Sequence, residues 1–322
     1  GRWVECVGYE QTYKFAAGTM PIALVRESDG TFSLKQLTWA ERAAGNDQSN
    51  PFPSFVNNTI NDVFLFRNRL GFLSGENVIL SEAGEYFNFF RTTTAALLDS
   101  APIDVTASTN KVSTLRSALP YNEKLLVFSD QTQFILDADP FLSPKTVSIT
   151  PTTEFTSFPN VKPIINGKSA FYGFSRTDFS GVGEFFVSVT DADQMDGADV
   201  TSHCPKYIKG SIKKFASATT EDVICCITDD TTSATLYVYK FFSNDQNQKV
   251  QSAWFKYVLG GTGDYITDID FIGNKLYLIV RRNSLMYLES LTFEDSQKDI
   301  GLDYAVLCDT KLQKISRANV TS

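Results

Sequence analysis

The stretch Phe66-Arg67-Asn68-Arg69-Leu70-Gly71-Phe72-Leu73-Ser74 determines the fold that we expect for this chain. It sets polar residues between two apolar runs, a pattern typical of two antiparallel strands joined by a turn. A dense aromatic segment follows shortly after it, Gly84-Glu85-Tyr86-Phe87-Asn88-Phe89-Phe90. We therefore predict a strand-turn-strand unit that is closed by a group of aromatic rings.

The same pattern recurs along the chain. A polar residue opens an apolar run, a polar turn follows, and a second apolar run comes next. Five such openers are spaced 44 to 55 residues apart: Arg69, Lys124, Lys168, Asp222 and Lys275. A repeat near this length, made of short antiparallel strands, is typical of propeller blades. The sequence predicts an all-β chain with a β-propeller of four-stranded blades over residues 54–322; the alternative is a β-sandwich or two small β domains.

Composition supports this fold class. The chain has 26 Phe and 13 Tyr but only three Met, and aromatic residues suit the half-buried surface of a sheet. With 43% hydrophobic and 20% charged residues, a sizeable core is expected rather than disorder. The proline-rich residues 142–163 fit an extended strand at a sheet edge, and residues 300–307 a final strand.

Residues 1–53 differ from the rest and are predicted to form a small β-rich segment with a short helix. Apolar runs at residues 22–26 and 31–35 flank Ser28-Asp29-Gly30, which indicates a hairpin. Thr38 and Glu41 have the spacing of a helix capping box, and Gly45 is a suitable helix end. Residues 46–53 are polar and proline-containing, so we place a domain boundary there.

Charge and cysteine content argue against several classes of protein. The formal net charge is −8, and an acidic chain does not bind DNA by neutralising its phosphates. The cysteine number is odd, and with one His and no C-x-x-C pair no disulfide framework or zinc site is expected. The simplest interpretation is free buried thiols in a chain folded in a reducing cytoplasm. No run approaches the roughly 18 apolar residues of a membrane span.

No residue pattern supports catalysis or a cofactor. His203 and Cys204 are adjacent in sequence, whereas a nucleophile pair needs side chains that face each other across a cleft. The best metal candidate is the run Asp191-Ala192-Asp193-Gln194-Met195-Asp196-Gly197-Ala198-Asp199. It misses the spacing of a calcium loop and lacks the closing Glu, so we interpret it as a solvated acidic loop. We predict no enzyme, no cofactor and no metal.

Two groups of residues are candidates for structural or interface roles. Strand alternation would put Arg67 and Arg69 on one face, where either could pair with a carboxylate of the fold or of a neighbouring subunit. Ordinary surface charge is the alternative. Four aromatic residues form either core or an exposed docking patch, and core is favoured because large apolar groups seldom stay exposed together. They are Tyr86, Phe87, Phe89 and Phe90.

Three blocks in this order resemble the nozzle proteins, or tail tubular B proteins, of short-tailed bacteriophages. They are Asn50-Pro51-Phe52-Pro53-Ser54-Phe55, the stretch at residues 66–74, and Thr201-Ser202-His203-Cys204-Pro205-Lys206-Tyr207-Ile208. The resemblance implies a homohexameric tube in the virion tail, around a channel through which double-stranded DNA leaves without sequence recognition. It also implies contacts with the tail adaptor and the tail fibre proteins. Members of this family are longer, so the propeller domain of residues 54–322 is expected to be incomplete.

Two other functions remain open from sequence. One is a glycan-binding or carbohydrate-active propeller that acts on the host surface, which an exposed aromatic platform beside Asp and Asn would favour. The other is a monomeric scaffold propeller from a cell.

Overall fold

The computed structural model describes residues 3–108, 112–121, 123–187, 195–244 and 249–293. Within these ranges the regular structure is 22 strands, β1 to β22, with two short 3₁₀ helices, Ala17–Thr19 and Thr219–Glu221. The prediction of an all-β chain is confirmed.

The strands form one separate hairpin and five antiparallel sheets, in which strands consecutive along the chain are hydrogen-bonded neighbours. The hairpin contains β1 (Ile22–Arg26) and β2 (Phe32–Gln36). Sheet 1 contains β3 (Ile60–Phe66), β4 (Arg69–Ser74), β5 (Asn77–Leu80) and β6 (Ile103–Thr106). Sheet 2 contains β7 (Leu115–Tyr121), β8 (Lys124–Ser129), β9 (Gln133–Ala138) and β10 (Val147–Thr153).

The other three sheets repeat this order. Sheet 3 contains β11 (Ile164–Asn166), β12 (Ser169–Arg176), β13 (Phe179–Val187) and β14 (Met195–Asp199), with the short β15 (Ile208–Lys209) also paired to β13. Sheet 4 contains β16 (Ile212–Ala218), β17 (Val223–Thr228), β18 (Thr235–Ser243) and β19 (Lys249–Val258). Sheet 5 has three strands within the described residues, β20 (Tyr265–Ile272), β21 (Lys275–Arg282) and β22 (Leu285–Thr292).

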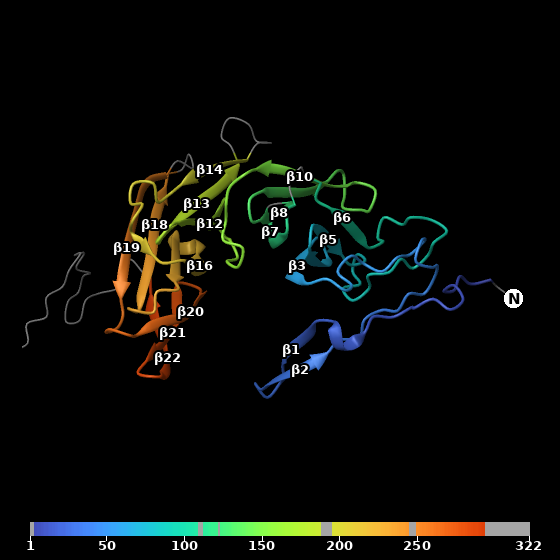
Figure 1. Cartoon of the computed structure of the whole chain (residues 1–322), viewed down its shortest axis with the longest axis horizontal. Coiled ribbons are helices and arrows are strands. Elements are labelled where there is room, and N and C mark those ends of the chain that lie inside the picture. The colour runs from blue at the N-terminus through green and yellow to red at the C-terminus, as the bar shows by residue number, and fades with distance from the viewer. Residues whose placement is uncertain (1–2, 109–111, 122, 188–194, 245–248, 294–322) are drawn as a thin grey trace, which may run out of the picture.

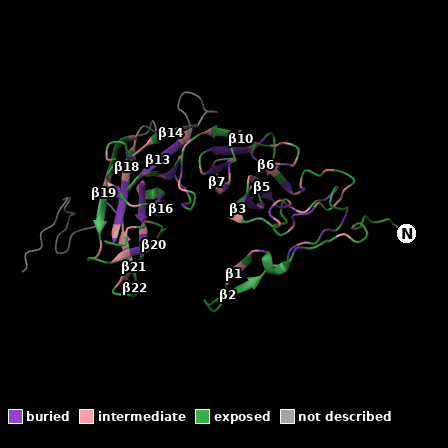
Figure 2. Ribbon diagram, viewed as in Figure 1, coloured by how far each residue is buried: buried purple, intermediate pink, exposed green. Residues whose placement is uncertain are grey.

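The five sheets follow one another around an arc (Figure 1). Their first strands adjoin: β3 contacts β7, β7 contacts β11, β11 contacts β16 and β16 contacts β20. A separate apolar core lies between each sheet and the next, and the buried residues in Figure 2 follow these boundaries. Four-stranded meanders packed side by side with their first strands innermost are the blades of a β-propeller. The predicted fold class is therefore correct.

The sequence repeat coincides with the second strand of each sheet. Arg69, Lys124 and Lys275 begin β4, β8 and β21, while Lys168 and Asp222 immediately precede β12 and β17. In sheets 1 to 4 the second strand lies inside its sheet with other sheets or loops on both faces, so most of its side chains are buried on both sides, whereas only one face of β21 in sheet 5 is fully buried. β17 is buried at all six positions. The sequence of a strand that is covered on both faces is a continuous apolar run, which explains why the second strands could be recognised from the sequence.

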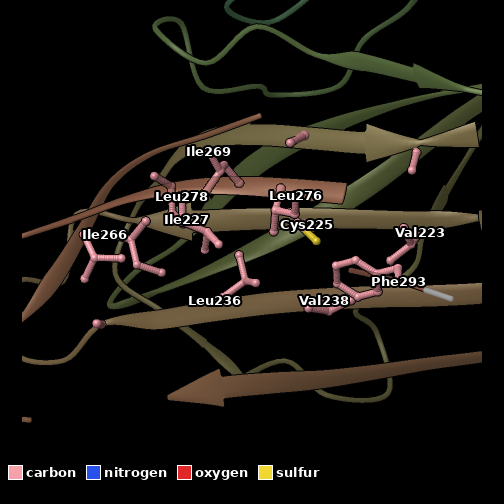
Figure 3. Packing of buried hydrophobic residues seen from close by; sticks show 14 residues of the cluster. Val223, Cys225, Ile227, Leu236, Val238, Ile266, Ile269, Leu276, Leu278 and Phe293 are labelled. Carbon is pink, nitrogen blue, oxygen red and sulfur yellow. The ribbon is translucent and has the colours of Figure 1, made fainter. Parts of the chain in front are cut away.

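The contact between sheets 4 and 5 illustrates how the sheets are joined (Figure 3). Val223, Cys225 and Ile227 of β17 and Leu236 and Val238 of β18 are almost fully buried against sheet 5. Sheet 5 contributes Ile266, Ile269, Leu276, Leu278 and Val280. Burial of one such aliphatic side chain stabilises the fold by about 1.5–3 kcal/mol, so this contact is a large part of what keeps the two sheets together.

The predicted hairpin at the N-terminus is present, but the short helix predicted at residues 38–45 is not. That segment has no regular secondary structure apart from an isolated bridge at Gly45. Its amides bond to distant chain, since Ala40 N–H donates to the Phe87 carbonyl (3.0 Å) and Arg42 N–H to the Tyr13 carbonyl (2.6 Å). These long-range bonds, together with the burial of Trp39 and Arg42, outweigh the local helix signal. The division at residue 53 stays a prediction, and residues on both sides of it share one aromatic core.

Several glycines lie directly opposite an aromatic residue on the neighbouring strand. Gly71 pairs with Phe64, Gly181 with Phe174 and Gly183 with Tyr172. In each pair the ring lies across the glycine, so that an added Cβ would come within 2.3 Å of a ring atom. The glycine in the stretch of residues 66–74 is therefore required by packing, because Phe64 occupies the volume of its missing side chain.

We expect Gly71→Ala to lower the free energy of unfolding by about 1–3 kcal/mol, because the methyl group would displace the Phe64 ring and overpack the core. Gly18→Ala is the matched control, since a Cβ at Gly18 meets no atom within 4 Å and its φ is not positive. Urea denaturation of both variants measures the difference. Equal stability of the two would contradict the packing explanation.

Candidate functional site

The turn between β3 and β4 separates the two arginines that sequence alternation had grouped. Arg67 and Asn68 both have positive φ, 43° and 60°, as in the type I′ turn of a two-residue hairpin. Arg67 therefore lies in the turn and Arg69 begins β4, so the expectation of one shared strand face is wrong. Arg67 Nη2 donates a hydrogen bond to the Glu123 carbonyl (2.6 Å), which links sheet 1 to the β7–β8 turn of sheet 2.

Arg69 is buried and its guanidinium bonds to main-chain carbonyls. Its Nη1 donates to the carbonyls of Ser81 (2.7 Å), Ala101 (2.8 Å) and Ser100 (3.1 Å), and its Nη2 to that of Asp99 (3.0 Å). A planar guanidinium offers five N–H donors in a fixed fork, which suits carbonyls that converge from one loop. These four acceptors lie in residues 81–102, between β5 and β6, and a longer bond from Nη2 reaches the Leu142 carbonyl (3.5 Å), so Arg69 fixes that loop to sheet 1 and also contacts the β9–β10 connection.

The electrostatic setting of Arg69 agrees with a structural role. Burial lowers the pKa of Arg69, and the charge of Glu82 opposes that shift. Arginine starts from a pKa so high that it stays protonated. Within the described part of the chain neither Arg67 nor Arg69 has a carboxylate ion-pair partner, so the proposed pairing with an acidic group is not made there.

The loop held by Arg69 carries the four aromatic residues singled out above, and the structure divides them. Phe89 stacks on Phe72 of β4 with ring centroids 5.1 Å apart, and Phe90 stacks on Phe15 at 4.8 Å. Both are buried. Tyr86 and Phe87 are each 40% exposed at the loop surface. The interpretation as core describes Phe89 and Phe90, whereas Tyr86 and Phe87 cover the edge of that core.

The two exposed rings still have definite partners. Phe87 meets Trp39 edge to face at 5.4 Å, and the Tyr86 hydroxyl donates to Asn68 Oδ1 at 2.6 Å. Through these adjacent rings the β5–β6 loop contacts both the β3–β4 turn and the N-terminal segment.

Sequence reasoning missed two residues that join the N-terminal segment to sheet 1. Arg42 is buried over the Phe52 ring, 4.5 Å from its centroid, and its Nη2 pairs with Asp47 at 2.7 Å. Asn50 donates to the carbonyls of Ala44 and Arg91 and accepts from Arg91 N–H, each at 2.9 Å. Among these partners only Arg91 is remote in sequence, 41 residues from Asn50, and only the asparagine's place in the Asn-Pro-Phe-Pro block set it apart.

The described residues contain no group of three or more His, Cys, Asp or Glu that could hold a metal. Asp199 from the acidic run pairs with Arg176 and accepts hydrogen bonds from Thr201, while residues 191–194 lie outside the described ranges. Cys225 and Cys226 are buried, and burial raises the pKa of both thiols, which keeps them protonated and unreactive. Cys6 is exposed, contrary to the expectation of burial, and Cys308 lies outside the described residues.

The surface features with the clearest capacity for binding are apolar. One face of the β1–β2 hairpin exposes Ile22, Leu24, Phe32 and Leu34, the last 69% accessible. Beside the hairpin base lies an open groove of about 1020 Å³ whose walls include Met20, Ile22, Phe55 and Ile60. No helix in the described residues is long and apolar enough to cross a membrane. The apolar hairpin face and the groove are surfaces suited to contact with protein.

Replacing Arg69 tests its role. We expect Arg69→Met to lower the free energy of unfolding by about 3 kcal/mol or more, because several buried carbonyls would each lose a donor at about 1–3 kcal/mol. Arg67→Met, with one exposed hydrogen bond, should change it by about 0.5 kcal/mol or less. Chemical denaturation followed by tryptophan fluorescence measures both. If the two variants lose equal stability, Arg69 does not hold the loop.

The chain is similar in sequence to known proteins. The family described as bacteriophage nozzle protein matches residues 1–322. Tail tubular protein gp12 of Escherichia phage T7 is 35% identical over 312 residues, which cover 97% of this chain but only 39% of that protein. The chain thus spans well under half the length of this relative.

Similarity to solved structures is weaker. Hsv2 of Kluyveromyces lactis aligns with a TM-score of 0.45 and 15% identity over 82% of this chain and 67% of that one. Hydrazine synthase of Kuenenia stuttgartiensis aligns with a TM-score of 0.42 and 9% identity over 74% and 64%. Neither likeness is close enough to support an argument, so the fold assignment rests on strand order.

The family match indicates the kind of protein, which the geometry of the chain alone does not. Nozzle proteins are structural parts of the phage tail, so the expectations of a virion tail protein and of a protein that is not an enzyme are confirmed by the family. The resemblance read from residues 50–55, 66–74 and 201–208 is confirmed as well. This chain belongs to the bacteriophage nozzle protein family.

Proposed function

We propose that this chain is part of a subunit of a ring-shaped tail nozzle, with six copies around a channel through which the phage DNA leaves. The observation that carries the proposal is the family match along all 322 residues. On this proposal the full-length protein also contacts the tail adaptor and the tail fibres. The role of the described sheets is mechanical, since the cores between them make a rigid body that an assembly can hold in place.

The β1–β2 hairpin is the part of the chain best suited to contact a neighbouring copy. A two-stranded hairpin is marginally stable alone, and this one leaves four large apolar side chains exposed on one face, which Arg26 and Gln36 share. Its other face carries Ala23, Val25, Ser33 and Lys35, the last paired with Glu27. Copies in a ring meet through two different surfaces, head to tail, so an apolar face on a projecting hairpin is suited to insert against the next subunit.

The charge of the chain suits passage of DNA. A surface that holds DNA does so with clustered Lys and Arg, which release counterions from the phosphates. This chain carries 37 acidic and 29 basic residues. An acidic wall would repel phosphate, so DNA would slide past it without sequence recognition or long residence.

The glycan-binding alternative has little support by comparison. It calls for an exposed aromatic platform beside Asp and Asn. Tyr86 lies beside Asn68, but the Tyr86 hydroxyl already donates to that amide, which leaves the Asn68 oxygen engaged within the fold.

Electron-microscopy class averages of the full-length protein, alone and in purified phage tails, test the proposal. The expected result is a sixfold tube at the tail tip with a central hole wide enough for duplex DNA. A compact monomer that is also missing from the tail would rule the nozzle function out and would make glycan-binding screens the next step.

Changes on the hairpin face test the subunit contact. We expect the full-length double variant Leu24→Glu, Leu34→Glu to assemble at least about tenfold more weakly, since buried charges in an interface cost several kcal/mol. Val250→Glu on β19 is the matched control, because it is also an exposed apolar strand residue but lies far from the hairpin in the chain. Analytical ultracentrifugation measures assembly. Normal assembly of the double variant would exclude the hairpin from the interface.

A further inference from the structure

The first strands of four sheets share an irregularity at the same place. In β3, β7, β16 and β20 the register with the second strand shifts near the start of the first strand, which is a β-bulge. The residues set out of register are Asn61, Arg116, Lys213 and Thr267. A bulge interrupts the ladder and redirects a side chain. Each of these sheets therefore has one redirected residue at an equivalent position of its innermost strand.

Sheet 3 has a cation at the same place without a bulge. The pairing of β11 with β12 is regular, and Lys162 lies two residues before β11. Asn61, Arg116, Lys162, Lys213 and Thr267 are spaced 46 to 55 residues apart, which is the period of the sheets. The first strands adjoin along the inner side of the arc, so equivalent positions on them lie near one another (Figure 1). Sheets 2, 3 and 4 thus bring one cation each to that side.

Two adjoining hollows lie along these strands and share Asn160 and Lys162. The first, of about 290 Å³, reaches Arg116 on β7. The second, of about 540 Å³, reaches Lys213 and Lys214 on β16. Four cations therefore line a continuous surface that crosses three successive sheets.

Carboxylates neutralise only part of this charge. Three of the cations are in ion pairs, which are Lys162 with Asp62, Arg116 with Asp130 and Lys214 with Asp268. The pair of Arg116 uses Nε, which leaves the two terminal nitrogens of the guanidinium available as donors. Lys213 is exposed and has no carboxylate partner in the part of the chain that the structure describes. The hollows thus keep cationic donors in a chain whose net charge is −8.

These donors suit a phosphate. A cleft lined by charge of one sign concentrates counter-ions, and guanidinium and ammonium groups are good donors to phosphate oxygens. The volumes of the two hollows are those of a site for a small molecule. We propose that the surface between Arg116, Lys162 and Lys213 binds a small phosphate anion, either free or as a monoester. The bound anion contacts three successive sheets and offsets the repulsion between their cations. This inference does not depend on the proposed hexamer.

Isothermal titration calorimetry of the full-length protein with inorganic phosphate, at constant ionic strength, tests the proposal. We expect saturable binding, and Lys213→Gln should weaken it at least about tenfold because a charge-assisted contact with the anion is lost. Lys206→Gln is the matched control, since Lys206 is also exposed and lines neither hollow, and it should leave the affinity unchanged. Circular dichroism checks that both variants keep the fold of the parent protein.

Further probes identify the source of the anion. Adenosine monophosphate is titrated beside inorganic phosphate, and the tighter of the two shows whether the site takes a monoester or the free ion. A poly-glutamate peptide and a short DNA duplex should not displace phosphate. The proposal is overturned if neither phosphate compound binds, or if Lys213→Gln binds phosphate as tightly as the parent protein. Displacement by the peptide or the duplex would also overturn it and would assign these cations to an acidic protein segment or to the DNA backbone.

Discussion

The burial of each sheet's apolar face against the next sheet is the constraint on which the rest of this structure depends. A three- or four-stranded sheet with two apolar faces cannot be covered by its own side chains, so it needs a neighbour on each side. The cores between sheets 1 and 2, 2 and 3, 3 and 4, and 4 and 5 meet this need in the same way (Figure 2). The order of sheets around the arc follows from it.

Sheet 1 meets the constraint differently, and that difference explains its unusual residues. Its outer face packs on loops and on the N-terminal segment, which are irregular and carry main-chain groups that no ladder satisfies. Buried main-chain carbonyls need donors. Arg69 supplies them to residues 81–102, and Asn50 supplies both a donor and an acceptor between residues 44 and 91. Buried polar side chains therefore gather where sheet packing is replaced by loop packing.

These features fit a structural part of a phage tail better than they fit a binding enzyme. The polar groups that are buried hold loops and segments together, and the thiols that are buried are kept protonated by their surroundings. The ion pairs that join different sheets, such as Lys249 with Glu184 and Lys214 with Asp268, add connections between neighbouring blades. The side-chain interactions of the chain make the sheets rigid, and its exposed apolar residues are suited to contact with other proteins.

The sequence by itself determined the repeat of strand pairs and their order along the chain, but not the number of blades. The second strand of sheets 1 to 4 is largely buried on both faces, so it forms an apolar run that can be recognised in the sequence without knowing its partners. The N-terminal hairpin and the proline-bearing outer strand β10 were predictable for the same reason, because turn and edge residues act locally.

Only the tertiary structure decided the features that depend on remote partners. Residues 38–45 carry a helix signal but bond to Tyr13 and Phe87, and Arg69 finds carbonyls rather than a carboxylate. Phe89 and Phe90 are buried while Tyr86 and Phe87 stay half exposed, although the four are nearly contiguous. A local sequence pattern shows the periodicity of apolar and polar residues, which depends only on neighbours in the chain. The partner of a buried polar group or an aromatic ring depends on which distant segments the fold brings next to it.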